Sequence, residues 1–284
     1  MTTVTTSPMQ EDTVLDAKRP PAVYYKTMVR SGYAPVNGFQ MYYEIHGTVT
    51  ARPLVTIHPG VGTANVFPSL ARNRQLIAVE LQGHGRSTDV DRPLTFEQEA
   101  DDVAALLNYL NIEQADFFGE SLGGVVTVMM AIRHPALVRR VAVYGAPFNS
   151  SGRTRSVEIA DGRPFDHERE GYQRVAPDPT RWPALFAKVA AMEWQGFSPE
   201  DLRSIKAAVL IATGDHDSFP VEHSLETSRL IPNAQLAVIP NASHFVLYAD
   251  PEKVLPIVAT FLDEPVSDVP FGTAMTGYHP GLTR

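Results

Sequence analysis

A Gly-Glu-Ser-Leu-Gly pentapeptide at 119–123 lies between two apolar runs of different kinds. The preceding residues, Ala115 to Phe118, predict a buried strand, and Leu122 to Arg133 predict a buried helix. At such a junction a Gly-x-Ser-x-Gly sequence is typical of a strained turn that exposes the serine oxygen, because small neighbours keep the backbone clear. A bare match arises by chance in roughly one chain in ten of this length, so the flanking strand and helix carry the interpretation. The alternative is a glycine-rich turn with an idle Ser121.

Further β-branched runs alternate with helical patterns along the chain. Strands are expected at Gln40 to Ile45, Leu54 to Ile57, Gln75 to Val79, Val138 to Val143, Ala207 to Ala212 and Gln235 to Ile239. Helices are expected at Thr95 to Leu110, Trp182 to Ala191, Glu222 to Leu230 and Glu252 to Leu262, the first opening with a capping box formed by Thr95 and Gln98. Several strands are apolar on both faces, which favours a mostly parallel sheet covered by helices on each side.

One region breaks the alternation. Residues 148–206 combine Gly, Pro and charge with short helical segments, and they predict a cap over the carboxyl edge of a core formed by 36–147 and 207–263. The alternative is a solvent-exposed excursion. Residues 1–35 and 264–284 are rich in Thr, Pro, Ser or Gly and are expected to be arms that contact a second copy of the chain or pack across the core.

Composition narrows the function classes. The absence of cysteine excludes disulfides, zinc-thiolate sites and a thiol nucleophile, so the chemistry must come from Ser, His, Asp, Glu or a bound cofactor. A net charge of −8 argues against a nucleic-acid partner. The chain has no apolar run long enough for a membrane span and no signal-peptide pattern near Met1, so we expect a soluble cytoplasmic protein.

A serine hydroxyl needs a base, and the base needs an orienting acid. His244 follows the expected strand that ends at Ile239, so it lies on the same sheet edge as Ser121. The acid is expected after the strand that ends at Ala212, where the chain reads Thr-Gly-Asp-His-Asp at 213–217. The resulting order, Ser then Asp then His, is that of one particular fold.

Two glycine-rich loops complete a resemblance. His-Pro-Gly-Val-Gly at 58–62 and Gly-His-Gly-Arg-Ser at 83–87 follow consecutive expected strands. With the serine elbow and the two later loops, they resemble the α/β-hydrolase superfamily, specifically its capped esterases and lactonases, from about Val36 to Leu262. The resemblance implies an α/β-hydrolase fold, a mostly parallel central sheet with helices on both faces and a small helical cap.

The resemblance also implies roles for individual residues. Ser121 would be the nucleophile, His244 the general base and acid, and Asp217, three residues after the loop glycine, the orienting carboxylate. The N–H of Leu122 would be one oxyanion donor, and that of Gly60 the second, with Val61 as the alternative. Asp215 is expected to shape the turn, and His58 and His84 are expected to organise loops.

Two positions depart from the superfamily pattern. Pro59 replaces a glycine and removes one backbone N–H donor. The identity of the second oxyanion donor is therefore not fixed by the resemblance. Glu120 stands where many superfamily members have His, and it is expected either to be buried with a partner beneath the elbow or to tune the triad electrostatically.

The activity implied by the resemblance is hydrolysis of small to medium uncharged carboxylic esters or lactones through an acyl-enzyme, and it requires no metal or organic cofactor. A proline iminopeptidase-like enzyme is an alternative, with Glu158, Glu168 and Glu170 available to hold an amine, and a non-enzymatic small-ligand receptor is another. The expected cap is rich in large apolar side chains, most of them cap core and some facing the cleft: Phe148, Phe165, Tyr172, Trp182, Phe186, Met192, Trp194 and Phe197. Such a wall favours short to medium or aromatic uncharged substituents.

Overall fold

The computed structural model describes residues 28–48, 52–149, 152 and 166–263. Its strands are β1 (Met28–Val36), β2 (Phe39–His46), β3 (Leu54–Ile57), β4 (Leu76–Val79), β5 (Ala115–Glu120), β6 (Val138–Tyr144), β7 (Ala208–His216) and β8 (Ala234–Ser243). Its helices are α2 (Phe96–Tyr109), α3 (Leu122–Arg133), α4 (Asp166–Val175), α5 (Trp182–Ala190), α6 (Pro199–Ser204), α7 (Val221–Leu230), α8 (Val246–Ala249) and α9 (Leu255–Asp263), with 3₁₀ turns η2 (Pro179–Arg181) and η3 (Pro251–Lys253). The C-terminal arm and most of the N-terminal arm lie outside the described residues.

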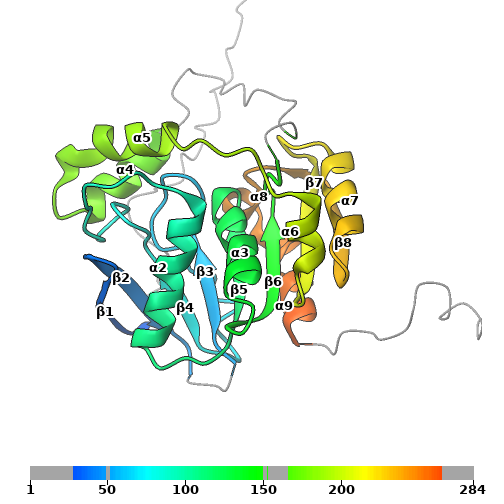
Figure 1. Ribbon diagram of the computed structural model, residues 1–284, viewed down its shortest axis with the longest axis horizontal. Coiled ribbons are helices and arrows are strands. Elements are labelled where there is room, and N and C mark those ends of the chain that lie inside the picture. The colour runs from blue at the N-terminus through cyan, green and yellow to red at the C-terminus, as the bar shows by residue number, and fades with distance from the viewer. Residues whose placement is uncertain (1–27, 49–51, 150–151, 153–165, 264–284) are drawn as a thin grey trace, which may run out of the picture.

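The strands form one eight-stranded sheet in the order β1-β2-β4-β3-β5-β6-β7-β8 (Figure 1). From β4 to β8 all neighbours are parallel, while β2 runs antiparallel to β1 and β4. Because the six parallel strands end at one edge, the loops after β3, β5, β7 and β8 meet there. The predicted α/β-hydrolase fold with a mostly parallel sheet is confirmed.

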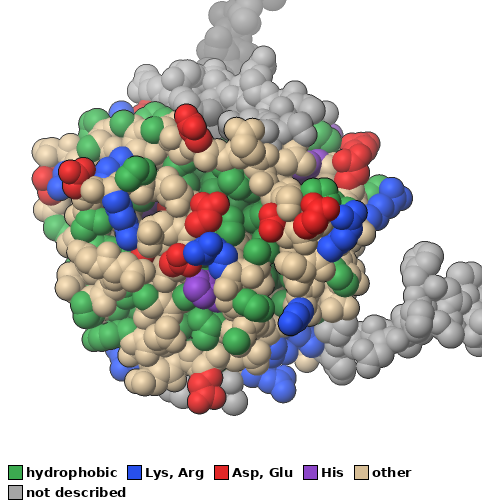
Figure 2. Space-filling view, viewed as in Figure 1, with side chains coloured by type: hydrophobic (Ala, Val, Ile, Leu, Met, Phe, Trp, Pro, Cys, Tyr) green, Lys and Arg blue, Asp and Glu red, His purple; other side chains and the backbone are tan. Residues whose placement is uncertain are grey.

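The sheet is packed on both faces. Successive residues of a strand point to opposite sides, so Val141 and Val143 of β6 pack with the α2 and α3 side, whereas Ala142 and Tyr144 pack with α9. This two-sided burial is why the central strands are apolar throughout. On the outer face of α2, α3 and α6, acidic and basic side chains are interleaved (Figure 2), and Arg133 of α3 bridges Asp101 of α2 at 2.7 Å.

Three local expectations need correction. The arm predicted for 1–35 overlaps the edge strand β1 (Met28–Val36). Gly32 and Pro35 interrupt the strand pattern in the sequence, although an edge strand tolerates proline. The capping box is half formed, because the Thr95 hydroxyl accepts from Gln98 N but the Gln98 side chain donates to Asp102 instead. The helix expected from Glu252 divides into η3 and α9.

The cap consists of α4, η2 and α5, which lie together above the β1, β2 and α2 side of the molecule (Figure 1). Its neck is closed where Phe197 N donates to Phe148 O at 2.9 Å and Asn149 pairs with Gly196. Both phenylalanines are buried in the main core.

The other expected cap side chains divide between the cap interior and its surface. Tyr172 and Trp182 pack in a separate cluster with Val61, which attaches the cap to the loop after β3. Phe186 is exposed, Trp194 packs against the main core, and Phe165 and Glu158 lie outside the described residues.

Candidate active site

Ser121 occupies a strained turn between β5 and α3. Its φ of 52° and ψ of −121° place a non-glycine residue in a conformation that costs free energy. The flanking glycines are required sterically, since a Cβ on Gly119 would lie 2.3 Å from Gly123 O and one on Gly123 would lie 2.4 Å from His58 O. Both glycines of the Gly-x-Ser-x-Gly sequence are therefore required, because a Cβ at either position would overlap neighbouring backbone atoms.

The structure brings the three predicted side chains into one hydrogen-bonded chain. His244 Nε2 lies 3.1 Å from Ser121 Oγ, and His244 Nδ1 lies 2.9 Å from Asp217 Oδ1. With the Nδ1 proton donated to the carboxylate, Nε2 is free to accept the serine proton. Asp217 is fully enclosed, and its second oxygen has no hydrogen-bond partner among the described residues.

Neighbouring elements hold this chain in place. Tyr144, at the end of β6, donates from its hydroxyl to Ser243 O at 2.7 Å and so anchors the residue before His244. Gly145 has a φ of +57°, and a Cβ there would lie 2.9 Å from Asp217 Oδ2. Asp215 accepts from Ala242 N at 3.1 Å, which ties the end of β7 to the end of β8, and this is the turn role expected for it.

The other side of the elbow offers backbone N–H groups. Among the described residues, the N–H groups of Gly60, Val61 and Leu122 have no hydrogen-bond acceptor. Leu122 begins α3, so its N–H also lies at the positive end of the helix dipole. All three predicted oxyanion donors are thus free to bind a negatively charged oxygen.

Two stacked histidine rings hold the loop after β3. His58 Nε2 accepts from Leu81 N at 3.2 Å, so its proton sits on Nδ1, which lies 3.3 Å from Pro59 O. His84 Nε2 lies 3.0 Å from Gly60 O, and its Nδ1 lies 3.0 Å from Gln82 O. Burial lowers the pKa of His84 to about 4, so at neutral pH the ring carries one proton and donates to one of the two carbonyls.

Glu120 is buried beneath the elbow and has a hydrogen-bond partner, which agrees with the first of the two expectations for this residue. The Asn65 side chain donates to its carboxylate at 3.4 Å. Burial, reinforced by the nearby Asp217 and Glu168 carboxylates and opposed by Asn65, raises the pKa of Glu120 to about 8. Sequence reasoning did not identify Asn65, which is 55 positions away from Glu120 along the chain.

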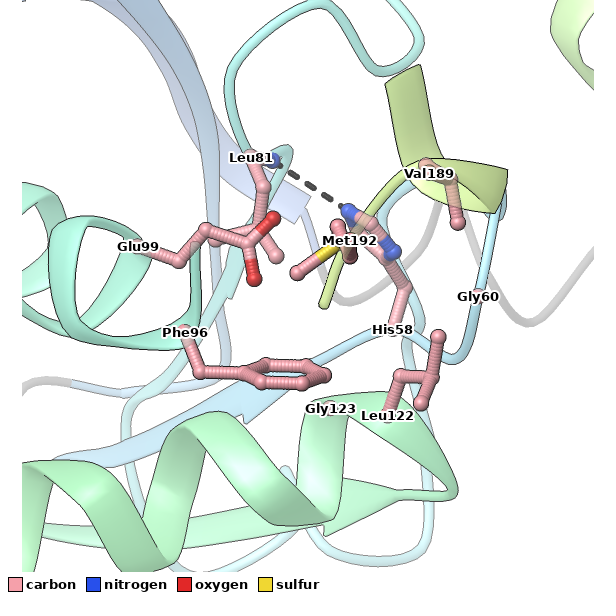
Figure 3. A pocket seen from close by; sticks show the side chains of 9 residues that line it. All are labelled: His58, Gly60, Leu81, Phe96, Glu99, Leu122, Gly123, Val189 and Met192. Atoms are coloured by element: carbon pink, nitrogen blue, oxygen red, sulfur yellow. Dashed lines mark hydrogen bonds between the residues drawn. The ribbon is translucent and has the colours of Figure 1, made fainter. Parts of the chain in front are cut away.

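A narrow pocket opens beside the loop of residues 58–62 after β3, which contains two of the predicted oxyanion donors and is called the oxyanion loop below (Figure 3). Its wall is formed by His58, Gly60, Leu81, Phe96, Glu99, Leu122, Gly123, Val189 and Met192. Of the large side chains expected to face the cleft, Met192 does so. Sequence reasoning missed Glu99, although its position three residues after Phe96 and four before Val103 places it on the apolar face of α2.

Of the three glutamates expected to hold an amine, two lie among the described residues. Glu158 lies outside the described residues, Glu170 is exposed, and Glu168 is half-buried with one carboxylate oxygen, Oε2, that lacks a hydrogen-bond partner within the described ranges. No group of three or more acidic or histidine side chains in the described part of the chain has metal-site geometry. No described helix has the length and apolar character to cross a membrane.

Comparisons with known proteins agree with this architecture. A profile of the alpha/beta hydrolase family matches residues 46–257. The 2-hydroxymuconate semialdehyde hydrolase of Pseudomonas putida is 28% identical over 247 residues, covering 78% of this chain and 86% of the relative. The 2-hydroxy-6-oxo-6-(2'-aminophenyl)hexa-2,4-dienoic acid hydrolase of Metapseudomonas resinovorans is 26% identical, covering 74% and 84%. The crystal structure of the enol-lactonase from Burkholderia xenovorans has a TM-score of 0.65 at 22% identity, covering 82% and 100%, and it shares the fold.

Proposed function

Because the chain belongs to the alpha/beta hydrolase family, we propose that it is a serine hydrolase of small to medium uncharged carboxylic esters or lactones. The observation that carries the proposal is the chain from Ser121 through His244 to Asp217, facing three unpaired backbone N–H groups. This is the arrangement that acyl transfer requires: a nucleophile, a base with an orienting acid, and a site for the oxyanion.

In the proposed reaction, Ser121 Oγ attacks the carbonyl carbon while its proton passes to His244 Nε2. The carbonyl oxygen becomes negatively charged and binds the N–H of Leu122 and that of Gly60, with Val61 as the alternative second donor. The intermediate expels the alcohol, which takes the proton from His244, and leaves an acyl group on Ser121. Water, deprotonated by His244, then releases the acid and restores the serine.

The charge of the site favours an uncharged substrate. Among the described residues, neither Arg nor Lys lines the pocket beside the oxyanion loop, and the ionisable groups in its wall are those of His58 and Glu99. The Glu120 and Glu168 carboxyl groups lie close enough to influence one another. A substrate carboxylate would meet no cation among the described residues of this wall.

The experiment is a comparison of kcat/KM for p-nitrophenyl esters of increasing chain length, a lactone and a prolyl-anilide. We expect a maximum at short or medium esters, and at least a 10³-fold loss in Ser121→Ala, on the pattern of serine nucleophiles. A maximum at long chains would contradict the pocket assignment. Stoichiometric ligand binding by the wild type without turnover would instead favour a receptor.

An aminopeptidase is the second candidate, and one observation favours it. The unpaired Oε2 of Glu168 belongs to the cap helix α4, and its carboxylate influences that of Glu120 beside the nucleophile. Two acidic groups could bind a free amine. Faster cleavage of the prolyl-anilide than of every ester, abolished in Glu168→Gln but not in Glu170→Gln, would establish this reading.

A further inference from the structure

Glu80 is a completely buried carboxylate that joins the loop after β3 to the loop after β4. It directly follows β4, and its Oε1 accepts from Ala64 N at 3.1 Å and from Arg86 Nη1 at 2.6 Å. Its Oε2 accepts from Arg86 N. Gly85 lies against the same group, because a Cβ at that position would overlap the Glu80 carboxyl. The two loops are therefore packed around this one side chain.

The segment that carries the proposed oxyanion donors is attached to the end of β4 on both sides. Before the donors, His58 Nε2 accepts from Leu81 N at 3.2 Å (Figure 3). After them, Ala64 N donates to Glu80. The N–H groups of residues 60–61 thus lie between two attachments to consecutive residues of one strand end.

The turn between these attachments moves as a unit. Gly62 N donates to Pro59 O at 2.8 Å, which closes residues 59–62 into a turn, so its orientation is set by the attachments on either side. Thr56 Oγ1 donates to Asn65 O at 2.6 Å and also holds the end of the segment against β3. Loss of the Glu80 contact is therefore expected to change the angle of the turn without unfolding the loop.

Neutralising Arg86 does not by itself account for where Glu80 lies. Arg86 Nη1 is also 3.5 Å from Glu44 Oε1, and the guanidinium lies 4.4 Å from the centroid of the Tyr42 ring, so the cation has other partners. Burial raises the pKa of Glu80 to about 6 against the opposing effect of Arg86, so at neutral pH the group is mostly ionised. An ionised carboxylate is a strong acceptor for the backbone N–H of Ala64.

We propose that Glu80 is a positioning residue, which holds the 59–62 turn at the angle that directs the Gly60 and Val61 N–H groups toward the carbonyl oxygen of a bound substrate. The inference rests on the proposed function for its reaction, and Glu80 acts through the loop. A misdirected donor loses part of the roughly 10²- to 10³-fold effect of one oxyanion N–H. Because the oxyanion forms only after the ground state, the loss should appear in kcat and not in KM.

The test measures cleavage of p-nitrophenyl butanoate and inhibition by an alkyl trifluoromethyl ketone. The ketone carbon bonds to Ser121 Oγ, the serine proton passes to His244, and the ketone oxygen becomes an oxyanion, so its Ki reports on the donors. Values of kcat are taken per site titrated with an organophosphate, which counts only folded, reactive enzyme. All variants are made in the full-length chain.

Glu80→Leu removes the acceptor for Ala64 N, and Glu80→Asp keeps a charge near Arg86 but is one methylene shorter. Either variant should lower kcat by about 10- to 100-fold, with KM changed by less than about threefold, and should raise the ketone Ki by the factor that kcat/KM falls. If Glu80→Leu does not fold, Glu80→Asp decides the question. Glu80→Gln keeps an acceptor for Ala64 N, so kcat should stay within about threefold of the wild type while Tm falls.

Glu44→Gln is the matched control, because it removes the other carboxylate near Arg86 from β2. It should lower Tm and leave kcat and the ketone Ki unchanged. Wild-type kcat and Ki in Glu80→Asp, equal losses in Glu80→Gln and Glu80→Leu, or the same losses in Glu44→Gln would each overturn the inference and leave the hydrolase standing. A wild type with neither ester turnover nor an organophosphate adduct would reject the proposed function, and the inference with it.

Discussion

The rings of His58 and His84 stack with their centroids 4.7 Å apart, and each ring contacts the carbonyl oxygen of a different peptide in one loop. His58 contacts Pro59 O and His84 contacts Gly60 O. In a trans peptide the C=O and the following N–H point in opposite directions. A hydrogen bond from His58 to Pro59 O therefore fixes where the Gly60 N–H points. The His84 tautomer with its proton on Nε2 does the same for the Val61 N–H through Gly60 O.

The two contacts explain how a loop with proline at 59 can still present the N–H groups that we propose as oxyanion donors. Pro59 contributes no N–H, yet its carbonyl also accepts from Gly62 N at 2.8 Å, so the turn closes around it. Within the described residues, the hydrogen bonds of the two histidine rings are all to backbone groups, so we expect them to act on peptide orientation. We class them as positioning residues.

His84→Ala is expected to lower kcat by about 10- to 100-fold, since a misdirected donor loses part of the 10²- to 10³-fold effect of one oxyanion N–H. KM should change by less than about threefold. Steady-state kinetics on a p-nitrophenyl ester would measure both constants. The exposed His216 provides the control as His216→Ala, and an unaltered kcat in His84→Ala would contradict the positioning role.

Ser121 is expected to be the single covalent nucleophile, because it lies in the strained elbow next to its base. Intact-mass measurement after organophosphate treatment should give one adduct on the wild type and none on Ser121→Ala. An unchanged adduct on the variant would falsify the assignment.

Asp217→Asn should reduce kcat by several orders of magnitude, since loss of the carboxylate misorients His244, as in other triads. Asp215→Asn should cost far less, because Asp215 contacts the backbone N–H of Ala242 and does not contact His244. The pair of variants has matched chemistry. A larger loss in Asp215→Asn would show that the wrong aspartate has been assigned.

Much of the fold could be predicted from short segments in which a strand, a loop and a helix follow one another along the chain. The strand, elbow and helix around Ser121 depend on neighbouring residues, and the chain order of Ser121, Asp217 and His244 follows from which strand precedes each loop. Edge strand β1 was missed because one face is exposed and Gly32 and Pro35 interrupt its pattern. Apolar burial therefore predicts central strands better than edge strands.

Contacts between segments that are far apart along the chain could not be predicted from the sequence. Nothing in the residues around Glu120 indicates Asn65 as its partner, and nothing near His84 indicates Gly60. The composition of the cap insertion also did not predict which of its large side chains pack into the main core, as Phe148 and Phe197 do. The burial of Glu99 could have been predicted, because this charged residue lies on the apolar face of the helical pattern of α2.

Glu120→Gln is expected to stabilise the protein more at pH 8 than at pH 5. The pKa of Glu120 is raised to about 8 in the folded state, so between about pH 4.5 and 8 the folded protein holds a proton that the unfolded chain has lost. Stability falls with rising pH in that window, by at most about 1.4 kcal/mol per unit of pKa difference. Glutamine keeps an acceptor for Asn65 without the proton linkage. Thermal denaturation should show a Tm increase of several degrees at pH 8 and less than about 1 °C at pH 5. Equal increases at both values, or the same effect in the exposed control Glu97→Gln, would contradict it.

Asp89 joins the cap to the core. Lys188 Nζ of α5 donates to Asp89 Oδ1 and to Val90 O at 2.8 Å each, and Arg181 bridges Asp89 at 3.0 Å. Asp89 is largely enclosed, so these bridges are less screened than ordinary surface pairs.

Asp89→Asn is expected to raise KM for short esters by about 3- to 10-fold with kcat within about twofold, the effect of one partly buried ion pair. The physical reason is position: Lys188 precedes Val189, which lines the pocket beside the oxyanion loop, so a loosened α5 disturbs that wall while the Ser121 chain stays intact. Raising NaCl from about 0.05 to 0.5 M should increase the wild-type KM and leave the variant nearly unchanged, because added salt screens an attraction the variant no longer has. Asp91→Asn, an exposed aspartate two residues along, should behave as the wild type. A wild-type KM in Asp89→Asn at low salt would show that the ion pairs do not hold the cap against the pocket.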